Sequence, residues 1–489
     1  MTMYVIGIGG TGSKCVEALT KLAAVGLLGK EKLKVLYIDA DETNGNLERS
    51  RKSLNNYIQC HNIVSGRQEQ HWMATPIETY DLWSPFTAVD TGQKLQDFFN
   101  YNNLKQENPV LGHFFDVLYT KDEQEVSLDM GFLGRPAIGA AVMSQLNLHT
   151  LKQEPWKTLI ADIERQTSPP KLLFCGSIFG GTGASGLPTI ARLVANKLEE
   201  DNHRRQTKIA ALLLLPYFGF STPPGTDPQG IYVRSEQFLL NTEAALRYYK
   251  NQAQETFDTV FLLGNPTLSK VNFSMGKNNQ CNHPHFLELF AGLAARHFNL
   301  NAETLKDKVV LLGGKEVGRL TWDDIPDHLQ VQPALSNGIR FAYTWLAEIV
   351  PELAQLLKTE NNRQIFYPWL LKFFPRDRDF DCLNNPQEQQ ALTTINDWCK
   401  DYLTWWYTLH QEEKEQIQLF NTGAFPNPET TLKREKLSEL VYGSDSNRSN
   451  RAKHTIQGLK RQLQKCQPDP SAKVRIIELA RTLYRFCQL

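Results

Sequence analysis

The chain has 489 residues, of which 41% are hydrophobic, and its formal net charge at pH 7 is +0. A chain of this length can bury a large core and suggests two or more domains, while its balanced charge argues against broad binding to nucleic acid or to acidic membranes. No apolar run approaches the ~18 residues of a membrane span and residues 3–7 already read as a strand, so we expect neither a membrane span nor a signal peptide.

The N-terminus predicts a strand, a glycine-rich turn and a helix. Residues 3–7 are apolar, residues 8–12 form the turn, and residues 13–22 have the spacing of an amphipathic helix. This order is the first half of a nucleotide-binding βαβ unit. Its candidate phosphate-binding residues are Gly9, Gly10, Thr11 and Gly12. One such turn alone is a weak signal.

A second strand, at residues 33–38, ends in two carboxylates, Asp39 and Asp41. Side chains at the carboxyl end of a parallel strand lie beside the ligand crevice of an open sheet. The alternative is an acidic loop that caps the next helix, since Asp and Asn are favoured N-caps. Further along, residues 131–141 are rich in Gly and Ala around Arg135. The planar guanidinium of Arg135 suits phosphate oxygens, and the alternative is a helix-capping loop with a solvated Arg.

The most informative stretch is GGTGASGLP at residues 180–188, directly after an apolar strand at 171–179. A glycine-rich turn between strand and helix exposes backbone N–H groups, which form a phosphate cradle with the positive end of the helix. The candidates are Gly180, Gly181, Thr182, Gly183 and Ala184. No Lys-Ser or Lys-Thr pair follows the glycines, so the turn is not of the Walker type. An ordinary tight turn in an α/β domain is the alternative.

This stretch resembles the glycine-rich loop of the tubulin/FtsZ superfamily, usually GGTG followed by a small residue and Gly. Here Ser185 stands where the last Gly belongs, which leaves the loop geometry open. The resemblance implies an α/β fold with a Rossmann-type parallel sheet, bound GTP or GDP, and Mg²⁺. It makes Asp39 and Asp41 candidates for water-mediated contact with Mg²⁺, and Arg135 part of a γ-phosphate loop.

The resemblance also implies residues for base recognition. Residues 209–216 form a fully apolar strand, followed by a loop at 217–225 on the ribose side by position. Asn241, in the helix at 236–249, resembles the tubulin Asn that contacts guanine. Asn282 opens a stretch that resembles the start of the central tubulin helix. An Asn amide both donates and accepts, so it matches the edge of guanine, although each Asn alone is more often a helix cap.

The prediction of GTP hydrolysis depends on shorter stretches that resemble the tubulin family. Tubulins complete their active site with an acidic loop from the next subunit, just after the central helix. Glu303 and Asp307 lie at about that distance, and Asp324 is a second candidate that lies further along the chain. Capped turns with solvated carboxylates are the alternative. A nucleotide-binding module without turnover therefore stays open.

A rival resemblance concerns the adenylating domain of ubiquitin-activating (ThiF-like), ATP-dependent enzymes. Residues 46–49, Asn-Leu-Glu-Arg, follow the acidic loop as in that family. The eight cysteines, however, form no Cys-x-x-Cys pair of the kind that family often carries, and the family gives no reason for GGTGASGLP. Scattered cysteines are typical of reduced thiols in a cytoplasmic protein.

The predicted organisation has three parts. A nucleotide-binding domain spans 1–305, with a polar insertion near 51–125; a hairpin at 306–332 forms a junction; and 333–489 is mostly helical. Aromatic residues at 366–374 and 398–407 are expected in the helical core, with a protein-partner surface as the alternative. The helical end departs from tubulin. The interpretation is a bacterial tubulin-like GTP-binding protein that assembles with itself, and we expect no nucleic-acid partner.

Overall fold

The structure is a computed structural model. It describes residues 2–65, 71–86, 93–128, 131–221, 234–274, 276–358, 368–374, 385–425, 436–443 and 454–488. Part of the predicted ribose-side loop (222–225) and part of the first aromatic stretch (366–367) lie outside these ranges.

A seven-stranded, wholly parallel sheet forms the centre of the molecule, in the order β3-β2-β1-β4-β5-β7-β9. The strands are β1 Thr2–Ile8, β2 Lys32–Ile38, β3 Ile77–Thr79, β4 Lys171–Ser177, β5 Lys208–Leu214, β7 Thr259–Gly264 and β9 Lys308–Gly313. Two short strands, β6 Phe218–Gly219 and β8 Ser269–Lys270, pair separately. The order starts 3-2-1 and then continues outward from β1, as in Rossmann-like folds. The α/β, Rossmann-like prediction is confirmed.

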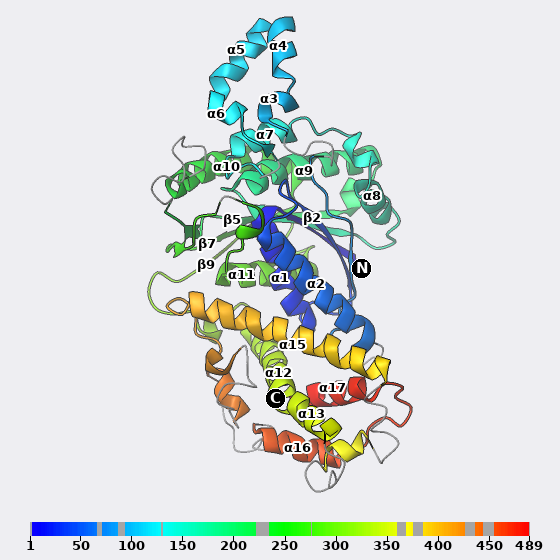
Figure 1. The fold of residues 1–489 in the computed structure, drawn as a ribbon. Coiled ribbons are helices and arrows are strands. Elements are labelled where there is room, and N and C mark those ends of the chain that lie inside the picture. Colours follow the sequence, from blue (N-terminus) through cyan, green and yellow to red (C-terminus); the bar gives the residue numbers. More distant parts are fainter. Residues whose placement is uncertain are drawn as a thin grey trace.

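Helices cover both faces of the sheet (Figure 1). On one face lie α1 Gly9–Ala24, α2 Gly45–Val64 and α11 Phe286–Asn301. On the other lie α7 Pro136–Met143, α8 Trp156–Glu164, α9 Gly181–Glu200 and α10 Ser235–Thr256. Alternate residues of β1 therefore enter two different cores: Met3 and Val5 the first, Tyr4 and Ile6 the second. A strand buried on both faces needs the continuous apolar sequence that β1, β4 and β5 have.

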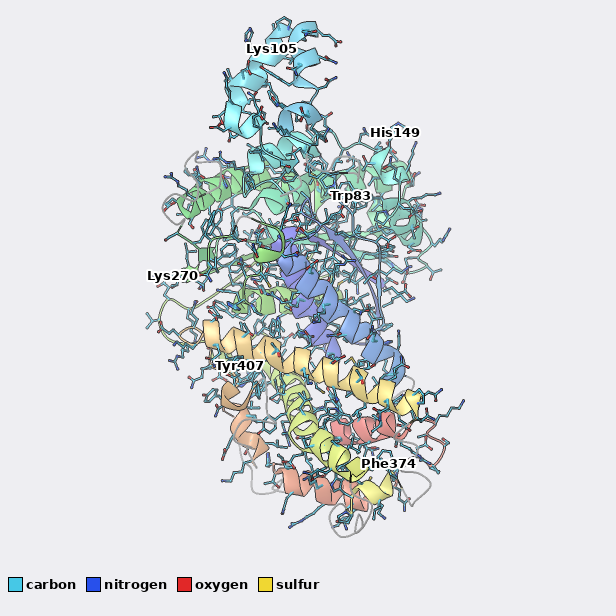
Figure 2. All side chains as sticks on the ribbon, in the orientation of Figure 1. Trp83, Lys105, His149, Lys270, Phe374 and Tyr407 are labelled. Carbon is cyan, nitrogen blue, oxygen red and sulfur yellow. The ribbon has the colours of Figure 1, made fainter. Side chains whose placement is uncertain are left out.

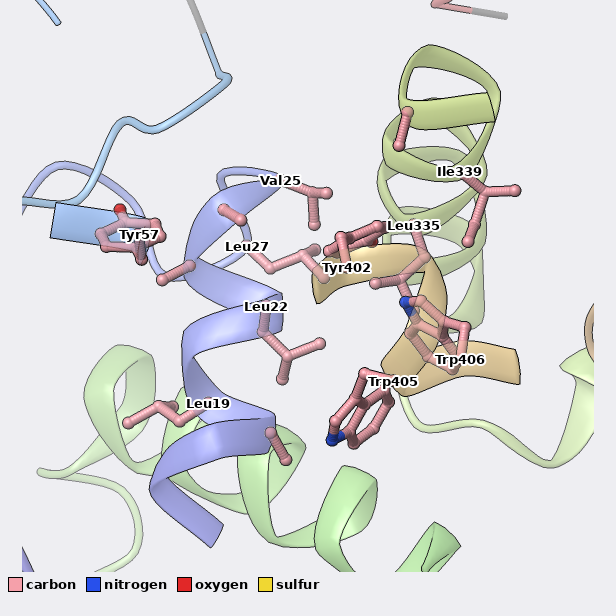
Figure 3. Close-up of a cluster of buried hydrophobic side chains, with 14 of the residues drawn as sticks. Leu19, Leu22, Val25, Leu27, Tyr57, Leu335, Ile339, Tyr402, Trp405 and Trp406 are labelled. Atoms are coloured by element: carbon pink, nitrogen blue, oxygen red, sulfur yellow. The ribbon is translucent and has the colours of Figure 1, made fainter. Parts of the chain in front are cut away.

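The C-terminal region is helical: α12 His328–Thr344, a π-helical turn Trp345–Ile349, α13 Val350–Lys358, α15 Pro386–Glu412, α16 Ile456–Lys465 and α17 Arg475–Phe486. The long helix α15 packs against α2 as well as α12 and α17. Figure 3 shows Leu22 of α1 and Val25, which directly follows α1, beside Tyr402 and Trp406 of α15, with Leu335 of α12 near them. One hydrophobic cluster therefore runs from α1, α2 and α11 into the C-terminal helices.

The aromatic residues at 398–407 of α15 contribute to this core, as predicted. Trp398, Tyr402, Trp405 and Trp406 are buried, and Tyr407 is partly buried against the core. In the other aromatic stretch, Trp369, Leu370, Phe373 and Phe374 are buried as well. The described residues also form short 3₁₀ helices: Thr150–Lys152, Arg204–Gln206, Lys277–Asn279, Trp322–Asp324, Leu370–Lys372, Thr422–Ala424 and Leu437–Leu440.

The predicted insertion differs from the observed one. Residues 51–64 belong to α2 and residues 77–79 to β3, so both are part of the main fold. The segment that leaves the body contains α3 Leu95–Phe98, α4 Tyr101–Glu107, α5 Pro109–Leu118 and α6 Lys121–Gln124. In Figure 1, α4 and α5 form a helical hairpin that projects from the body. A single residue, Asn108, joins them, and its side chain caps α5, which begins at Pro109.

The predicted junction hairpin at 306–332 is wrong. Its first half, Lys308–Gly313, is β9, which pairs in parallel with β7 at the edge of the sheet, so the sheet extends past residue 305. The apolar run at 308–313 is long enough to form either one strand of a hairpin or a strand of the main sheet. Which of the two forms depends on the strand with which the run pairs, and that strand, β7, lies far away in the sequence. Among the described residues, no helix is long and apolar enough to cross a membrane.

Candidate functional site

A pocket lies at the carboxyl ends of β1, β2 and β4, beside the point where the strand order changes direction between β1 and β4. Open α/β sheets bind their ligands at such switch points. The empty volume of the pocket is about 970 Å³, and part of this volume is open to solvent. It is lined by Gly9, Gly10, Thr11, Lys14, Asp39, Asp41, Asn44, Asn46, 131–134, Ser177, 179–183, Tyr217, Phe218, Phe220, Phe238, Phe273, Ser274, Gly276, Gln280 and Asn282.

The first glycine turn supplies one wall. Gly9, at φ +73°, occupies a left-handed conformation that suits glycine, and it starts α1. Gly9, Gly10 and Thr11 line the pocket. Gly12 does not: a Cβ there would lie 2.5 Å from the carbonyl oxygen of Cys175. Gly12 is therefore required for the packing of the turn against β4.

The second glycine turn supplies the facing wall. Gly180 is the N-cap residue of α9, with no side-chain cap, and Gly180 to Gly183 all line the pocket. The first amides of a helix have no acceptor within the helix, so those at the start of α9 are available to an anion. A Cβ on Gly181 would lie 2.9 Å from Cβ of Phe132, so this glycine also lets the 131–134 loop approach. Ala184 lies in α9 and is not a lining residue.

The acidic loop after β2 joins the two turns. Asp39 is buried; its Oδ1 accepts hydrogen bonds from the Thr182 hydroxyl (3.3 Å) and the Asp41 amide (3.2 Å). Its Oδ2 is buried without a hydrogen-bond partner, and burial raises the pKa of Asp39 to about 7. Asp41 accepts from Thr43 through Oδ1 and from the Lys277 amide (2.6 Å) through Oδ2. Asp39 thus faces the pocket, while Asp41 also holds its loops together.

Two asparagines, Asn44 and Asn46, connect the pocket to the segment before α11. Asn44 was not among the predicted site residues, and Asn46 was considered only as part of the rival adenylating motif. Asn44 caps α2 through Oδ1, and its Nδ2 donates to Oε1 of Gln280 (2.9 Å). The Asn46 side chain accepts from the amide of Asn282 (2.8 Å). Both asparagines follow Asp39 and Asp41 at the carboxyl end of β2, and this position in the sequence could have identified them as residues beside the pocket. Asn282, the predicted base contact, is one of the lining residues, and α11 itself begins later, at Phe286.

The pocket also has an aromatic wall that was not predicted as such, although two of its residues belong to the loop at 217–225 that was expected on the ribose side. Phe179, Phe218, Phe220, Phe238 and Phe273 line the pocket and contact one another, with ring centroids 4.8 Å apart for Phe179 and Phe238 and 5.7 Å apart for Phe220 and Phe273. The five phenylalanines come from four separate segments, so no single sequence motif could predict that they form one wall. Flat apolar rings offer a stacking surface for a planar ligand.

Lys14 is the third missed feature. Its side chain is 3% exposed and is paired with Glu288, whose side chain is fully buried. The Tyr217 hydroxyl donates to the same Glu288 carboxylate (2.9 Å), and the Lys14 ammonium lies 5.6 Å from the centre of the Tyr217 ring. Lys14 and Tyr217 also line a second pocket, next to the end of α15. The pair joins α1 to α11 beneath the ligand pocket.

Several predicted residues lie outside the pocket lining. Arg135 is paired with Glu123 of α6. Asn241 lies behind the aromatic wall, where its amide donates to the carbonyl oxygen of Phe179 (3.1 Å). Arg49, from the rival adenylating motif, is paired with Glu17 and donates to the carbonyl oxygen of Asn282.

None of the predicted catalytic acids lines the pocket of the same chain, and two of them, Glu303 and Asp307, lie at the opposite edge of the sheet. Glu303 pairs with Lys208, the first residue of β5 (2.9 Å), and Asp307 directly precedes β9. Both therefore lie at the amino edge of the sheet, beyond the far end of α11, whose 16 residues span about 24 Å. Asp324 pairs with Lys315, which follows β9. These residues stay predictions that involve a second molecule.

Among the described residues, no group of three or more His, Cys, Asp or Glu side chains is placed to hold a metal ion. The sequence matches no known protein-family model, and no curated protein sequence matches it.

Proposed function

We propose that this chain is a tubulin/FtsZ-like protein that binds GTP and assembles with itself in a nucleotide-dependent way. The observation that carries the proposal is the convergence of two glycine-rich turns, after β1 and β4, on one pocket at the switch point of the sheet. The turns are more than 160 residues apart in the sequence, and each has the glycine-rich sequence expected of a phosphate-binding turn. Their meeting in one pocket favours a single ligand that uses both.

The pocket suits an anion. Both α1 and α9 begin at it, so the positive ends of two helix dipoles point toward the same space. Neither helix has an acidic residue in its first turn that would repel a phosphate. Lys14 is engaged by Glu288, so the proposal assigns phosphate binding to backbone amides and to the Thr11 and Thr182 hydroxyls. The Thr182 hydroxyl has one proton, which it donates to Asp39 in this structure, so in the proposal it turns from Asp39 to the phosphate when the ligand binds.

Mg²⁺ fits the acidic loop in one specific way. The unpartnered, buried Oδ2 of Asp39 is a suitable acceptor for a water molecule on a metal ion, whereas both oxygens of Asp41 already accept hydrogen bonds. Mg²⁺ at nucleotide sites is commonly held by one or two carboxylates, phosphate oxygens and water. We assign Asp39 to the Mg²⁺ hydration shell and Asp41 to loop positioning. Bound Mg²⁺ would neutralise charge on the phosphates.

The aromatic wall and Asn282 are assigned to the base. Stacking on Phe rings does not discriminate between purines, so the preference for guanine rests on the amide of Asn282, which can donate and accept. Asn241 supports the wall through Phe179.

Assembly and hydrolysis follow from the placement of Glu303 and Asp307. The pocket opens at the carboxyl edge of the sheet and these acids lie at the amino edge, so a head-to-tail contact would bring them to the pocket of the next molecule. Such a heterologous contact propagates into a filament when it does not close. In this proposal the acids position the attacking water, and hydrolysis rises more than linearly with protein concentration.

The test of nucleotide binding uses Thr182. The Thr182→Val variant removes the hydroxyl at nearly constant volume, and Thr182→Ser retains it. Gly181 is a poorer choice, because a side chain there would press on Phe132. We expect GTP affinity to fall roughly 10- to 100-fold in Thr182→Val, the usual effect of a lost hydrogen bond to a charged group, and little in Thr182→Ser.

Nucleotide released from the purified protein by denaturation identifies the ligand directly. The proposal predicts GTP or GDP, with binding weakened by Asn282→Ala. Tight ATP binding that is indifferent to Asn282→Ala would favour the adenylating enzyme instead. GTP binding with a flat specific activity and no assembly over a concentration series would leave a nucleotide-binding module without turnover.

A further inference from the structure

The projecting hairpin carries an exposed apolar stripe along α5. Its residues are Val110, Leu111, Phe114, Val117 and Leu118, and each is about half exposed or more; Val110 is 76%, Phe114 58% and Val117 82% exposed. At helical spacing these five positions fall on one face. Continuous apolar faces on projecting elements mark interaction sites.

The stripe is not the face that holds α5 in the hairpin. The inner face packs through Phe115, whose ring lies 5.2 Å from Tyr101 and 5.8 Å from Phe99, between centroids. Gly112 allows close approach, since a Cβ there would lie 2.9 Å from Cα of Lys105. Figure 2 shows Lys105 near the outer end of the hairpin, away from the body. The apolar stripe therefore has no packing role within the described part of the chain.

The pattern of the stripe is symmetric about Phe114. Val110 and Leu118 lie four residues to either side of Phe114, and Leu111 and Val117 lie three residues to either side. If two copies of α5 cross antiparallel with a twofold axis at Phe114, Val110 of one copy meets Leu118 of the other, and Leu111 meets Val117. A twofold interface between identical copies, unlike a head-to-tail one, requires this kind of self-complementarity.

We propose that the α5 stripe is a contact between two copies of this chain, formed by antiparallel packing of α5 on α5 about Phe114. Charge is compatible with this arrangement. Asp116, the one charged residue of α5, is bound on the inner side by Lys105 and Tyr101. Glu107 and Lys121, of opposite sign, flank α5 at equal sequence distance from Phe114, so antiparallel packing brings unlike charges toward each other.

The area of the stripe sets the strength of the contact. Burying side chains of this size removes on the order of 100 Å² each, which gives about 1,000 Å² over both copies. Stable interfaces bury about 1,200–2,000 Å², and about 1,000 Å² is the lower bound for a specific contact. We therefore expect a reversible dimer that dissociates on dilution. It needs no nucleotide, so it is separate from the nucleotide-dependent assembly proposed above.

Sedimentation over a concentration series, with nucleotide removed, tests the dimer. Val117→Asp places a charge in the stripe, and Val317→Asp is the matched control because Val317 is also exposed (87%) but lies after β9. We expect the dimer Kd to rise at least tenfold in Val117→Asp and to stay unchanged in Val317→Asp, with circular dichroism showing that both remain folded. A wild-type monomer at every concentration, or equal effects of the two substitutions, would overturn the proposal.

Disulfide cross-linking tests the antiparallel geometry. The background variant replaces Cys281, which is exposed, and Cys382, which lies outside the described residues, by Ser. In this background Phe114→Cys should cross-link with itself. Val110→Cys and Leu118→Cys should cross-link efficiently only when the two variants are mixed. Self-cross-linking of Val110→Cys as strong as in the mixture would contradict antiparallel packing. The Thr182→Val substitution should leave these results unchanged, which separates them from the proposed function.

Discussion

The buried pair of Lys14 and Glu288 gives a prediction whose size follows from the structure. The side chains are 3% and 0% exposed, so the Lys14→Met variant leaves the carboxylate of Glu288 inside the protein without its cation. Removing one partner of a buried ion pair costs about 3–5 kcal/mol. Glu288 keeps the Tyr217 hydroxyl and the His285 amide as hydrogen-bond donors, so we expect the lower end of this range.

A double-mutant cycle isolates the interaction. Glu288→Gln alone leaves the Lys14 ammonium buried without its carboxylate, and should also be costly. The double variant Lys14→Met/Glu288→Gln has no buried charge at this position, and should be more stable than either single variant. Urea unfolding of the nucleotide-free proteins at pH 8 measures all four corners of the cycle.

The reasoning would be refuted if the two substitutions were additive, or if Lys14→Met cost less than about 1 kcal/mol at pH 8.

Two more predictions concern the pocket. Asp39→Asn should stabilise the nucleotide-free protein by about 1–3 kcal/mol at pH 8. Burial raises the pKa of Asp39 from 3.8 to about 7, so the charged carboxylate destabilises the folded protein by about 4 kcal/mol at this pH. The neutral Asn removes this destabilisation but leaves one buried amide without a hydrogen-bond partner, which offsets part of the gain. This gain in stability should fade between pH 7 and pH 4, because Asp39 in the folded protein becomes protonated and loses its charge. Unfolding curves recorded across that pH range measure the effect. A gain that does not change with pH would contradict the prediction. Gly12→Ala should destabilise the fold by more than about 2 kcal/mol, since its Cβ meets the rigid carbonyl of Cys175, whereas Gly180→Ala meets only the Ser177 hydroxyl at 3.0 Å and should cost much less. Similar melting temperatures of the two alanine variants would argue against this difference.

The parts of the fold that depend on short stretches of chain were predictable. The apolar runs at β1, β4 and β5 indicated buried parallel strands, and each glycine-rich turn indicated a strand-to-helix transition. The acidic residues Asp39 and Asp41 were expected at the crevice, because the carboxyl end of a strand defines the ligand edge of a parallel sheet. All of these follow from the alternation, capping and conformational freedom of neighbouring residues.

The other features were decided by the tertiary structure. The apolar run at 308–313 became an edge strand of the sheet because β7 was available as its partner. The aromatic wall gathers phenylalanines from separate segments, and Lys14 meets Glu288 only because α1 packs on α11. Arg135 illustrates the same limit: its charge suggested a phosphate contact, but a carboxylate on α6 lies within reach. Local sequence determines which groups a segment offers, whereas the partner of each group depends on which distant segments the shared core brings beside it.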